Sequence, residues 1–204
     1  DDSARLFKSD FLELFSHVHP SVPLIVYIPV MSYCIYKASS NPDLSGGSIV
    51  GLFFSGLLFW TLTEYLLHRF VFHYAPTTEW GKYLHFMMHG VHHDYPNDSL
   101  RLVLPPVVSI PLALLFYSLF VFVLGATYTF AFFAGFILGY MLYDSWHYAS
   151  HHFGMKSKFW LDLKQYHMLH HYQDPQTRFG VSSPLWDYAF GTTAAKEEKK
   201  TVEA

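Results

Sequence analysis

The chain has 204 residues, of which 51% are hydrophobic and only 14% are charged. Soluble domains carry roughly 25% charged residues, so this composition favours a membrane protein. The 13 Lys and Arg residues against 16 Asp and Glu give a formal net charge of -3, which excludes a basic nucleic-acid-binding protein. The length predicts one domain. The single cysteine, Cys34, excludes an internal disulfide framework and a thiolate zinc cluster.

Two apolar segments in the first third of the chain are predicted to cross a membrane, at about 22–38 and 49–67. We expect no secretory signal peptide before them, because no positive stretch precedes an apolar core and a cleavage site. The second segment has one charge, Glu64, near its end. The first is short and contains Pro23 and Pro29, so a re-entrant or interfacial segment is the alternative there.

The longest apolar stretch runs from Leu102 to Tyr143, where 42 residues include no Asp, Glu, Lys, Arg or His. One membrane span needs about 20 apolar residues. The stretch therefore predicts two spans, at about 102–124 and 126–143, with a tight turn near Gly125. A buried hairpin of a soluble protein is the alternative, although it would rarely lack a charge over such a length.

The distribution of positive charge predicts the orientation of these four spans. If all four cross, both termini share one side with the segments 68–101 and 144–192. That side has 12 of the 13 Lys and Arg residues, with only Lys37 opposite, and it has all 14 histidines. The positive-inside rule then places it in the cytosol. We therefore predict an all-α integral membrane protein of two helical hairpins, with a cytosolic helical cap (68–101 and 144–192) and a disordered tail (193–204).

The histidines are the main functional signal, because 12 of the 14 lie in two windows, 68–93 and 147–171. His17 and His19 lie outside these windows and are assigned no metal role. Each window contains one H-x-x-H-H motif, at 89–93 and 167–171. On a helix, residues four apart share a face. The first and last histidines of each motif can therefore bind one ion, while the middle histidine points toward another.

Ten of these histidines are predicted to bind two metal ions, because neutral imidazole is the commonest metal ligand in proteins. His147 and His151 form a further pair four residues apart, whereas the five-residue spacing of His68 and His73 suits a helix end that loosens. The helix faces predict how the ligands are shared. The first ion is assigned His68, His73, His89, His93 and His170. The second ion is assigned His92, His147, His151, His167 and His171.

Two alternative interpretations explain less of the histidine pattern. A single histidine near a membrane span is more often a hydrogen-bonded core residue, and a pH-sensing cluster is a further alternative. Neither explains two identical H-x-x-H-H motifs together with two more pairs. A closed structural zinc site needs four ligands, and Mg²⁺ and Ca²⁺ prefer oxygen. Zn, Cu, Fe and Ni all remain compatible with imidazole ligands.

Five polar residues near the predicted ligands are candidates for supporting them. Glu64 precedes His68 by four residues on one helix face, and a carboxylate inside a membrane is usually functional. Asp144 could orient an imidazole through its second nitrogen, or simply cap a helix end. The remaining supporting positions are His85, Asp94 and His152, for which a surface location or a turn is the alternative.

For a few further residues, the sequence allows two alternative roles or predicts a structural one. Arg101 and Lys164 could meet the head group of a lipid, or could anchor the chain at the membrane surface. Tyr143 could contact a substrate, or belong to the aromatic belt of the membrane interface. Trp186 and Asp187 are expected to close the cap by packing and hydrogen bonding.

Specific strings then relate the chain to a family. It resembles the membrane fatty acid hydroxylase superfamily, and most closely the fatty acid 2-hydroxylases, over residues 24–192. The resemblance is carried by LHRFVFH at 67–73, LHFMMHGVHHD at 84–94, RLVLPP at 101–106, LGYMLYDSWHY at 138–148, YHMLHHY at 166–172 and FGVSSPLWDYAFGT at 179–192.

The resemblance implies a membrane-bound dinuclear metal oxygenase that hydroxylates C2 of long-chain acyl groups of sphingolipids or ceramides. It implies O₂ as co-substrate and a cytochrome b5-type electron donor, either separate or on a segment outside this sequence. The ten histidines fall on the metal-binding positions of the family. Iron is the implied working metal, and zinc is able to occupy the site in isolated protein. The implied location is the endoplasmic reticulum in a eukaryote, or the inner membrane in a bacterium.

Alternatives to 2-hydroxylation come from inside and outside this superfamily. A member acting on sterols and an acyl desaturase share the histidine pattern. A histidine-rich metal transporter would need polar residues inside its spans to form a path, and the 102–143 stretch offers none with a charge. A scaffold stabilised by metal without catalysis is the last alternative.

Overall fold

The computed structural model describes residues 5–194, which form helices and connecting segments with no strand in this range, as the predicted all-α fold requires. The predicted disorder of the tail concerns mainly residues 195–204, which lie outside the described residues. In chain order the helices are α1 (Asp10–Leu14), α2 (Val22–Ser39), α3 (Gly46–Leu67), η1 (His68–Phe72), α4 (Glu79–His85), η2 (Phe86–Gly90), α5 (Val91–Asp94), α6 (Pro106–Leu124), α7 (Ala126–His152), α8 (Lys158–Tyr172) and α9 (Leu185–Phe190).

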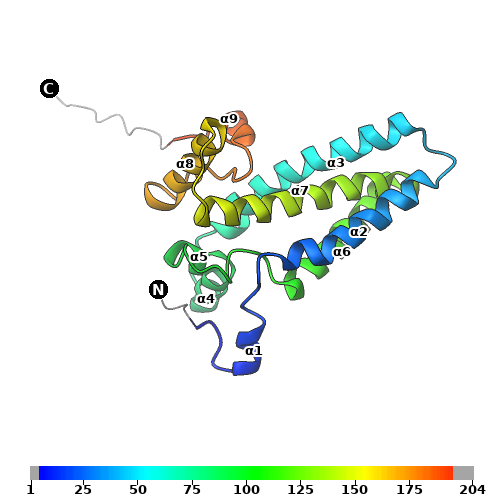
Figure 1. Cartoon of the computed structure of the whole chain (residues 1–204). Helices are drawn as coiled ribbons and strands as arrows, with labels where there is room; N and C mark the ends of the chain where they lie inside the picture. Colours follow the sequence, from blue (N-terminus) through cyan, green and yellow to red (C-terminus); the bar gives the residue numbers. More distant parts are fainter. Residues whose placement is uncertain (1–4, 195–204) are drawn as a thin grey trace.

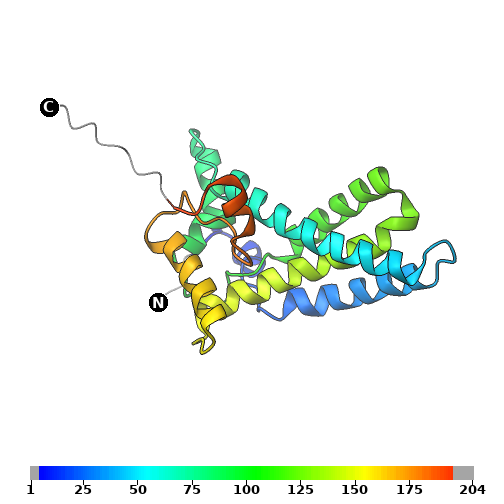
Figure 2. The same ribbon diagram turned by 90° about the horizontal axis from the view of Figure 1, so that it is seen from above.

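Four helical segments are long and apolar enough to cross a membrane: α2, α3 with η1, α6 and α7. They run side by side (Figures 1 and 2), with the α2–α3 loop and the α6–α7 turn at one end. The short helices α4, α5, α8 and α9 gather at the other end. Gly125 alone connects α6 to α7, at the predicted turn, and its φ of 79° is a conformation that glycine adopts readily. This arrangement separates an apolar bundle from a polar cap.

Helix α7 is the centre of the bundle, because α2, α3 and α6 all pack against it. Helix α3 packs mainly on α7 rather than on α2, its neighbour in sequence. Close approach of the two backbones depends on glycine. A Cβ at Gly56 would overlap the carbonyl of Phe132, and a Cβ at Gly135 would overlap the carbonyl of Phe53. Small residues at such crossings are typical of helix packing in membranes.

Two predicted boundaries differ from the helix ends in the structure. Helix α6 begins at Pro106 rather than near 102, because consecutive prolines favour a helix start there. Leu102 and Val103 are instead buried in the segment before it. Helix α7 continues past Tyr143 to His152 without a break. A fall in hydropathy marks the residue at which an apolar span gives way to charged residues. A helix ends only where its backbone hydrogen bonds end.

Two π-helical segments carry histidines in the cap. Helix α3 runs directly into η1, where the backbone N–H of His73 donates to the carbonyl of His68 at 3.1 Å. This bond spans five residues and therefore explains how two histidines five apart share one face. The second π-helical segment, η2, contains His89 and continues directly into α5. The helix end that was expected to loosen is thus a π-turn.

Candidate metal centre

The structure brings the ten predicted ligands together in two groups, within each of which one nitrogen per residue lies within 4.8 Å of the others. The membership is the one predicted from helix faces, and metal binding itself stays a prediction. Group one consists of His68, His73, His89, His93 and His170. Group two consists of His92, His147, His151, His167 and His171.

Group one is assembled from four elements, η1 with the residue after it, η2, α5 and α8. The Nε2 atom of His68 lies 3.1 Å from the Nε2 atoms of both His73 and His89. The Nε2 atom of His170 lies 3.0 Å from that of His73, and the Nε2 atom of His93 lies 3.0 Å from that of His89. Five imidazole nitrogens therefore converge on one point between the helices.

Group two is assembled from α5, α7 and α8 in the same way. The Nε2 atom of His92 lies 2.8 Å from that of His147 and 3.1 Å from that of His171. The Nε2 atom of His167 lies 3.0 Å from that of His151 and 3.1 Å from that of His171. Each H-x-x-H-H motif contributes to both groups, so α5 and α8 join the two groups into one centre.

The spacing and chemistry of these nitrogens fit a bound transition-metal ion. Metal–imidazole bonds are about 2.0–2.1 Å long, which places two nitrogens at right angles roughly 3 Å apart. His68 and His170 each donate from Nδ1 to a backbone carbonyl, so their neutral rings present lone pairs at Nε2. Several lone pairs at this spacing repel one another, and a cation relieves that repulsion. The residues present therefore suit Zn, Fe or a similar ion.

The electrostatics of the cap keep five of the predicted ligands neutral, as metal ligands must be. Burial lowers the pKa of His73 to about 2 and that of His93 to about 3, and neighbouring imidazoles lower both further by repelling a second positive charge. Burial also lowers the pKa of His170, to about 4. The pKa of His89 and that of His92 lie well below the ordinary value for the same two reasons.

A loop after α8, which we call the carbonyl loop (residues 177–182), supports group one. The Nδ1 atom of His68 donates to the carbonyl of Phe179 at 2.5 Å, and the Nδ1 atom of His170 donates to the carbonyl of Thr177 at 2.6 Å. Such bonds fix the tautomer and the ring orientation of a metal-binding histidine. Sequence reasoning missed these partners, because every residue has a carbonyl and no side chain marks the ones that are used.

Two buried carboxylates hold the carbonyl loop. Glu64 accepts hydrogen bonds from the backbone N–H groups of Val181 and Ser182. Asp187 accepts from the N–H groups of Phe179 and Gly180. Glu64 therefore acts on group one through the loop rather than through contact with an imidazole. Asp187, which was expected only to close the cap, serves the same loop.

The other predicted supporting residues lie around the two groups without joining either. Asp94 is exposed at the end of α5, and His85 is half-buried at the end of α4. His152 is half-buried, and its ring packs on that of Tyr148 at 4.5 Å between centroids. Asp144 is 2% exposed and lines a cavity. A supporting role for these four residues stays a prediction.

Arg101 has a structural role and also lines a cavity beside the histidines, so its contact with a head group stays a prediction. Its guanidinium is buried and forms ion pairs with Glu13 at 2.5 Å and with Asp98 at 3.2 Å. It also donates to the hydroxyl of Ser16 at 3.1 Å. These contacts hold α1 and the residues after it against the segment that precedes α6.

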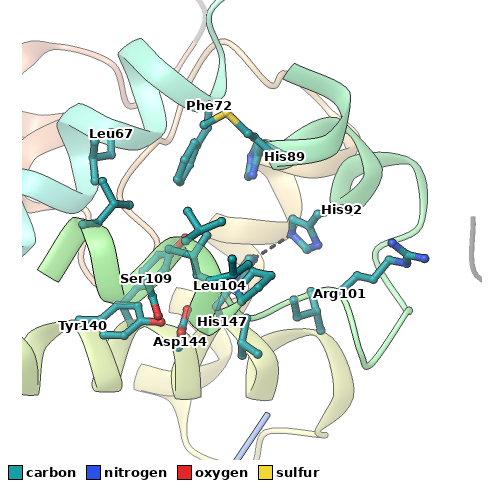
Figure 3. A pocket seen from close by; sticks show the side chains of 18 of the residues that line it. Leu67, Phe72, His89, His92, Arg101, Leu104, Ser109, Tyr140, Asp144 and His147 are labelled. Atoms are coloured by element: carbon teal, nitrogen blue, oxygen red, sulfur yellow. Dashed lines mark hydrogen bonds between the residues drawn. The ribbon is translucent and has the colours of Figure 1, made fainter. Parts of the chain in front are cut away.

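An apolar cavity of about 620 Å³ opens beside the histidines. His89, His92 and His147 lie at its cap end, and Asp144, Tyr140 and Ser109 lie together on another part of its wall (Figure 3). From there the cavity continues between the long helices. The side chains that line its apolar part include Trp60, Val108, Leu112, Ala113, Phe116, Phe136 and Ile137.

Taken together, four membrane-length helices, two groups of five imidazoles and an adjoining apolar cavity define a histidine-rich helical membrane protein built to hold an apolar molecule beside its histidines. Comparison with known proteins identifies its family. A model of the fatty acid hydroxylase family matches residues 53–192. The chain belongs to the fatty acid hydroxylase family.

Characterised relatives cover nearly the whole chain. It is 38% identical over 192 residues to a dihydroceramide fatty acyl 2-hydroxylase of Arabidopsis thaliana, covering 94% of this chain and 80% of that protein. It is 39% identical to the fatty acid 2-hydroxylase of Rattus norvegicus, covering 95% of this chain and 57% of that protein. The solved structure of full-length scs7p, in which only the hydroxylase domain is visible, matches with a TM-score of 0.86 at 37% identity. That match covers 91% of this chain and 70% of the scs7p chain.

Proposed function

We propose that the protein hydroxylates C2 of long-chain fatty acyl groups of sphingolipids or ceramides. The observation that carries this proposal is the continuity of the cavity, whose wall passes from His89, His92 and His147 to apolar side chains between the long helices. The names of the relatives, which specify 2-hydroxylation and in one case a dihydroceramide substrate, support the position and the lipid class.

The shape of the cavity suits reaction near the head of an acyl chain. C2 is bonded to the carbonyl carbon, so a substrate with C2 at the histidines keeps its polar end in the cap. Its tail then extends along α6, where Phe116 lies about 15 Å along the helix axis from Pro106. Apolar walls there hold the tail and exclude water from the reacting carbon.

The proposed ligands are the ten histidines of groups one and two, five for each of two ions. Bound there, the ions would activate O₂ with electrons from a cytochrome b5-type donor, and iron is the metal we expect in the working enzyme. The histidines hold the ions at the cap end of the cavity, and burial keeps the rings neutral. The helices position the acyl chain so that C2 is the carbon presented.

The same proposal assigns a topology. The segments 68–101 and 144–192 form a cap on the cytosolic side, supported by the 12 of 13 Lys and Arg residues on that side of four spans. The chain then forms one domain, comprising residues 1–204. Its substrate enters from the bilayer, and a soluble electron donor docks from the cytosol. In a eukaryote this membrane would be that of the endoplasmic reticulum, and in a bacterium the inner membrane.

Lipid mass spectrometry tests the reaction and separates it from desaturation. The chain is expressed in a host that lacks 2-hydroxylated lipids, beside His171→Ala and the control His19→Ala, whose ring is exposed and belongs to neither group. We expect the wild type and His19→Ala to add one oxygen at C2 and no double bond. His171→Ala should abolish that product. Unsaturated products without 2-hydroxylation would instead support the desaturase alternative.

A further inference from the structure

The two histidine groups differ in how the protein supports their imidazoles. In group one, the Nδ1 atoms of His68 and His170 each donate to a carbonyl of the carbonyl loop. In group two, the Nδ1 atoms of His92, His167 and His171 are buried and have no hydrogen-bond partner among the described residues, and only the ring of His147 has a backbone partner, Leu102. A partner at the second nitrogen orients a metal-binding imidazole and makes it more basic. The protein therefore orients the rings of group one, through one loop, more fully than those of group two.

The carbonyl loop is held rigidly enough to act as such a partner. On one side, Glu64 accepts from the N–H groups of Val181 and Ser182 at 2.8 and 2.7 Å, and from the hydroxyl of Ser182 at 2.5 Å. The carboxylate of Glu64 is buried on α3, four residues before His68. One helix thus supplies a ligand and, one turn away, the group that fixes the loop behind that ligand.

On the other side, Asp187 holds the same loop from α9. Its carboxylate accepts from the N–H groups of Phe179 and Gly180 at 2.9 and 2.8 Å, and from the hydroxyl of Thr192 at 2.7 Å. Gly180 is required for this approach, because a Cβ there would overlap the carbonyl of Ser183 and crowd the carboxylate. The side chain of Asp187 is completely buried, so water does not compete for these bonds.

The backbone of the loop is also shaped for its task. Arg178 lies between Thr177 and Phe179, whose carbonyls accept from the imidazoles. Its backbone φ is 60°, a value that residues other than glycine rarely adopt. Its N–H donates to the carbonyl of Thr192 at 2.7 Å. Such strain persists only where the surrounding structure enforces it. Here it allows the carbonyls of Thr177 and Phe179 to reach two different imidazoles.

We propose that Glu64 and Asp187 are positioning residues that, through the carbonyl loop, make group one the tighter and slower-exchanging of the two metal sites. Group two is then the site from which an ion is lost first. This inference rests on the proposed function for the presence of two ions, but it makes a separate statement about their inequality.

Chelator competition on the purified full chain loaded with Zn²⁺ tests the proposal. We expect EDTA to remove one ion quickly and the other slowly, as counted by elemental analysis over time. Loaded His171→Ala should retain the slow ion, and loaded His73→Ala should retain only the fast one. Release of both ions from the wild type at one rate, or the opposite assignment in these two variants, would overturn the proposal.

Variants of the loop contacts test the positioning role itself. Glu64→Gln should weaken binding of the slow ion by roughly 10–100-fold and leave the fast ion unchanged. Glu79→Gln is the matched control, because Glu79 is exposed and, among residues 5–194, forms an ion pair with Lys82 alone. Ser182→Ala removes the hydroxyl that donates to the carboxylate of Glu64, and we expect a smaller weakening of slow-ion binding. This variant is sufficient as a test if Glu64→Gln does not fold.

The outcomes separate a positioning role from general structural damage, and this proposal from the proposed function. Equal weakening of both ions in Ser182→Ala, or no change in either, would overturn the positioning role. A shifted absorption spectrum of the Co²⁺-loaded slow site in the same variant would support it. Two unequal ions without any 2-hydroxylated product would refute the proposed function and leave this inference standing.

Discussion

Gly135 on α7 lies so close to Phe53 on α3 that a Cβ at Gly135 would overlap the Phe53 carbonyl oxygen. This contact sets the separation of the two helices that continue into the cap with His68 and His147. The bundle therefore determines how far apart the two ends of the histidine centre lie, although neither Gly135 nor Phe53 belongs to the cap.

Gly135→Ala should lower the free energy of unfolding by about 1–3 kcal/mol, because the added carbon meets backbone atoms that cannot rotate away. The measurement is thermal unfolding in detergent, together with the metal content of the folded fraction. Gly51→Ala is the control, because no atom lies within 4 Å of a Cβ at Gly51. Equal unfolding temperatures for the two variants would show that α3 and α7 are not in close contact.

Ala113→Phe should shift the products toward shorter acyl chains. Ala113 on α6 lines the cavity, so a larger side chain there occupies space that the tail would use. Leu114→Phe is the matched control, because the side chain of Leu114 is 61% exposed and points away from the cavity lining. The chain lengths of the 2-hydroxylated products, measured by mass spectrometry, decide the question. An unchanged length profile in Ala113→Phe would contradict the proposed position of the tail.

The stability of the folded protein should fall as the pH decreases below about 6.5, the ordinary pKa of histidine. The folded protein lowers the pKa of His73 to about 2 and that of His93 to about 3. Between these values and 6.5 the unfolded chain binds more protons, so the stability that neutral rings contribute is present above 6.5 and is lost as the pH falls. Protons also compete with the ions for the imidazoles.

Dialysis of loaded protein over a series of pH values, followed by elemental analysis and thermal unfolding, checks this expectation. The ion content and the unfolding temperature should decline together in acid. An unfolding temperature that stays constant or increases between pH 6.5 and pH 4 would be incompatible with histidines that are buried and neutral in the folded chain.

The proposed topology predicts opposite locations for two positions on the chain. A reporter inserted at residue 45, in the α2–α3 connection, should lie outside the cytosol, whereas a reporter at the C-terminus should lie inside it. Paired fusions active on opposite sides of the membrane, such as a phosphatase and a fluorescent protein, measure this directly. The same signal from both positions would rule out four crossings.

Helical periodicity was sufficient to predict how the histidines are grouped. Residues four apart share a helix face, so His89 and His93 separate from His92, and the structure has this separation. The five-residue spacing of His68 and His73 indicated a loosened helix end but could not specify a π-turn. The carbonyls of Thr177 and Phe179 were beyond prediction, because main-chain acceptors are identical at every residue.

Charge gave less information than histidine spacing. For Arg101 the sequence predicted either a contact with a lipid head group or anchoring at the membrane surface. It could not predict the ion pair with Glu13, which lies 88 positions away and is brought near only by the fold. Hydropathy located four apolar spans and ended the last one near Tyr143, because it responds to polarity, whereas α7 itself continues through polar residues to His152.

The number of metal ions per chain tests the central claim most directly. Protein purified in detergent is loaded fully with metal, freed of excess and analysed for its metal and protein content, beside His92→Ala and His170→Ala. The wild type should contain two ions per chain, one for each group of five histidines. Each variant should lose ions, because each alters one group, and His19→Ala should keep both. One ion or fewer per chain in the wild type would contradict a dinuclear centre.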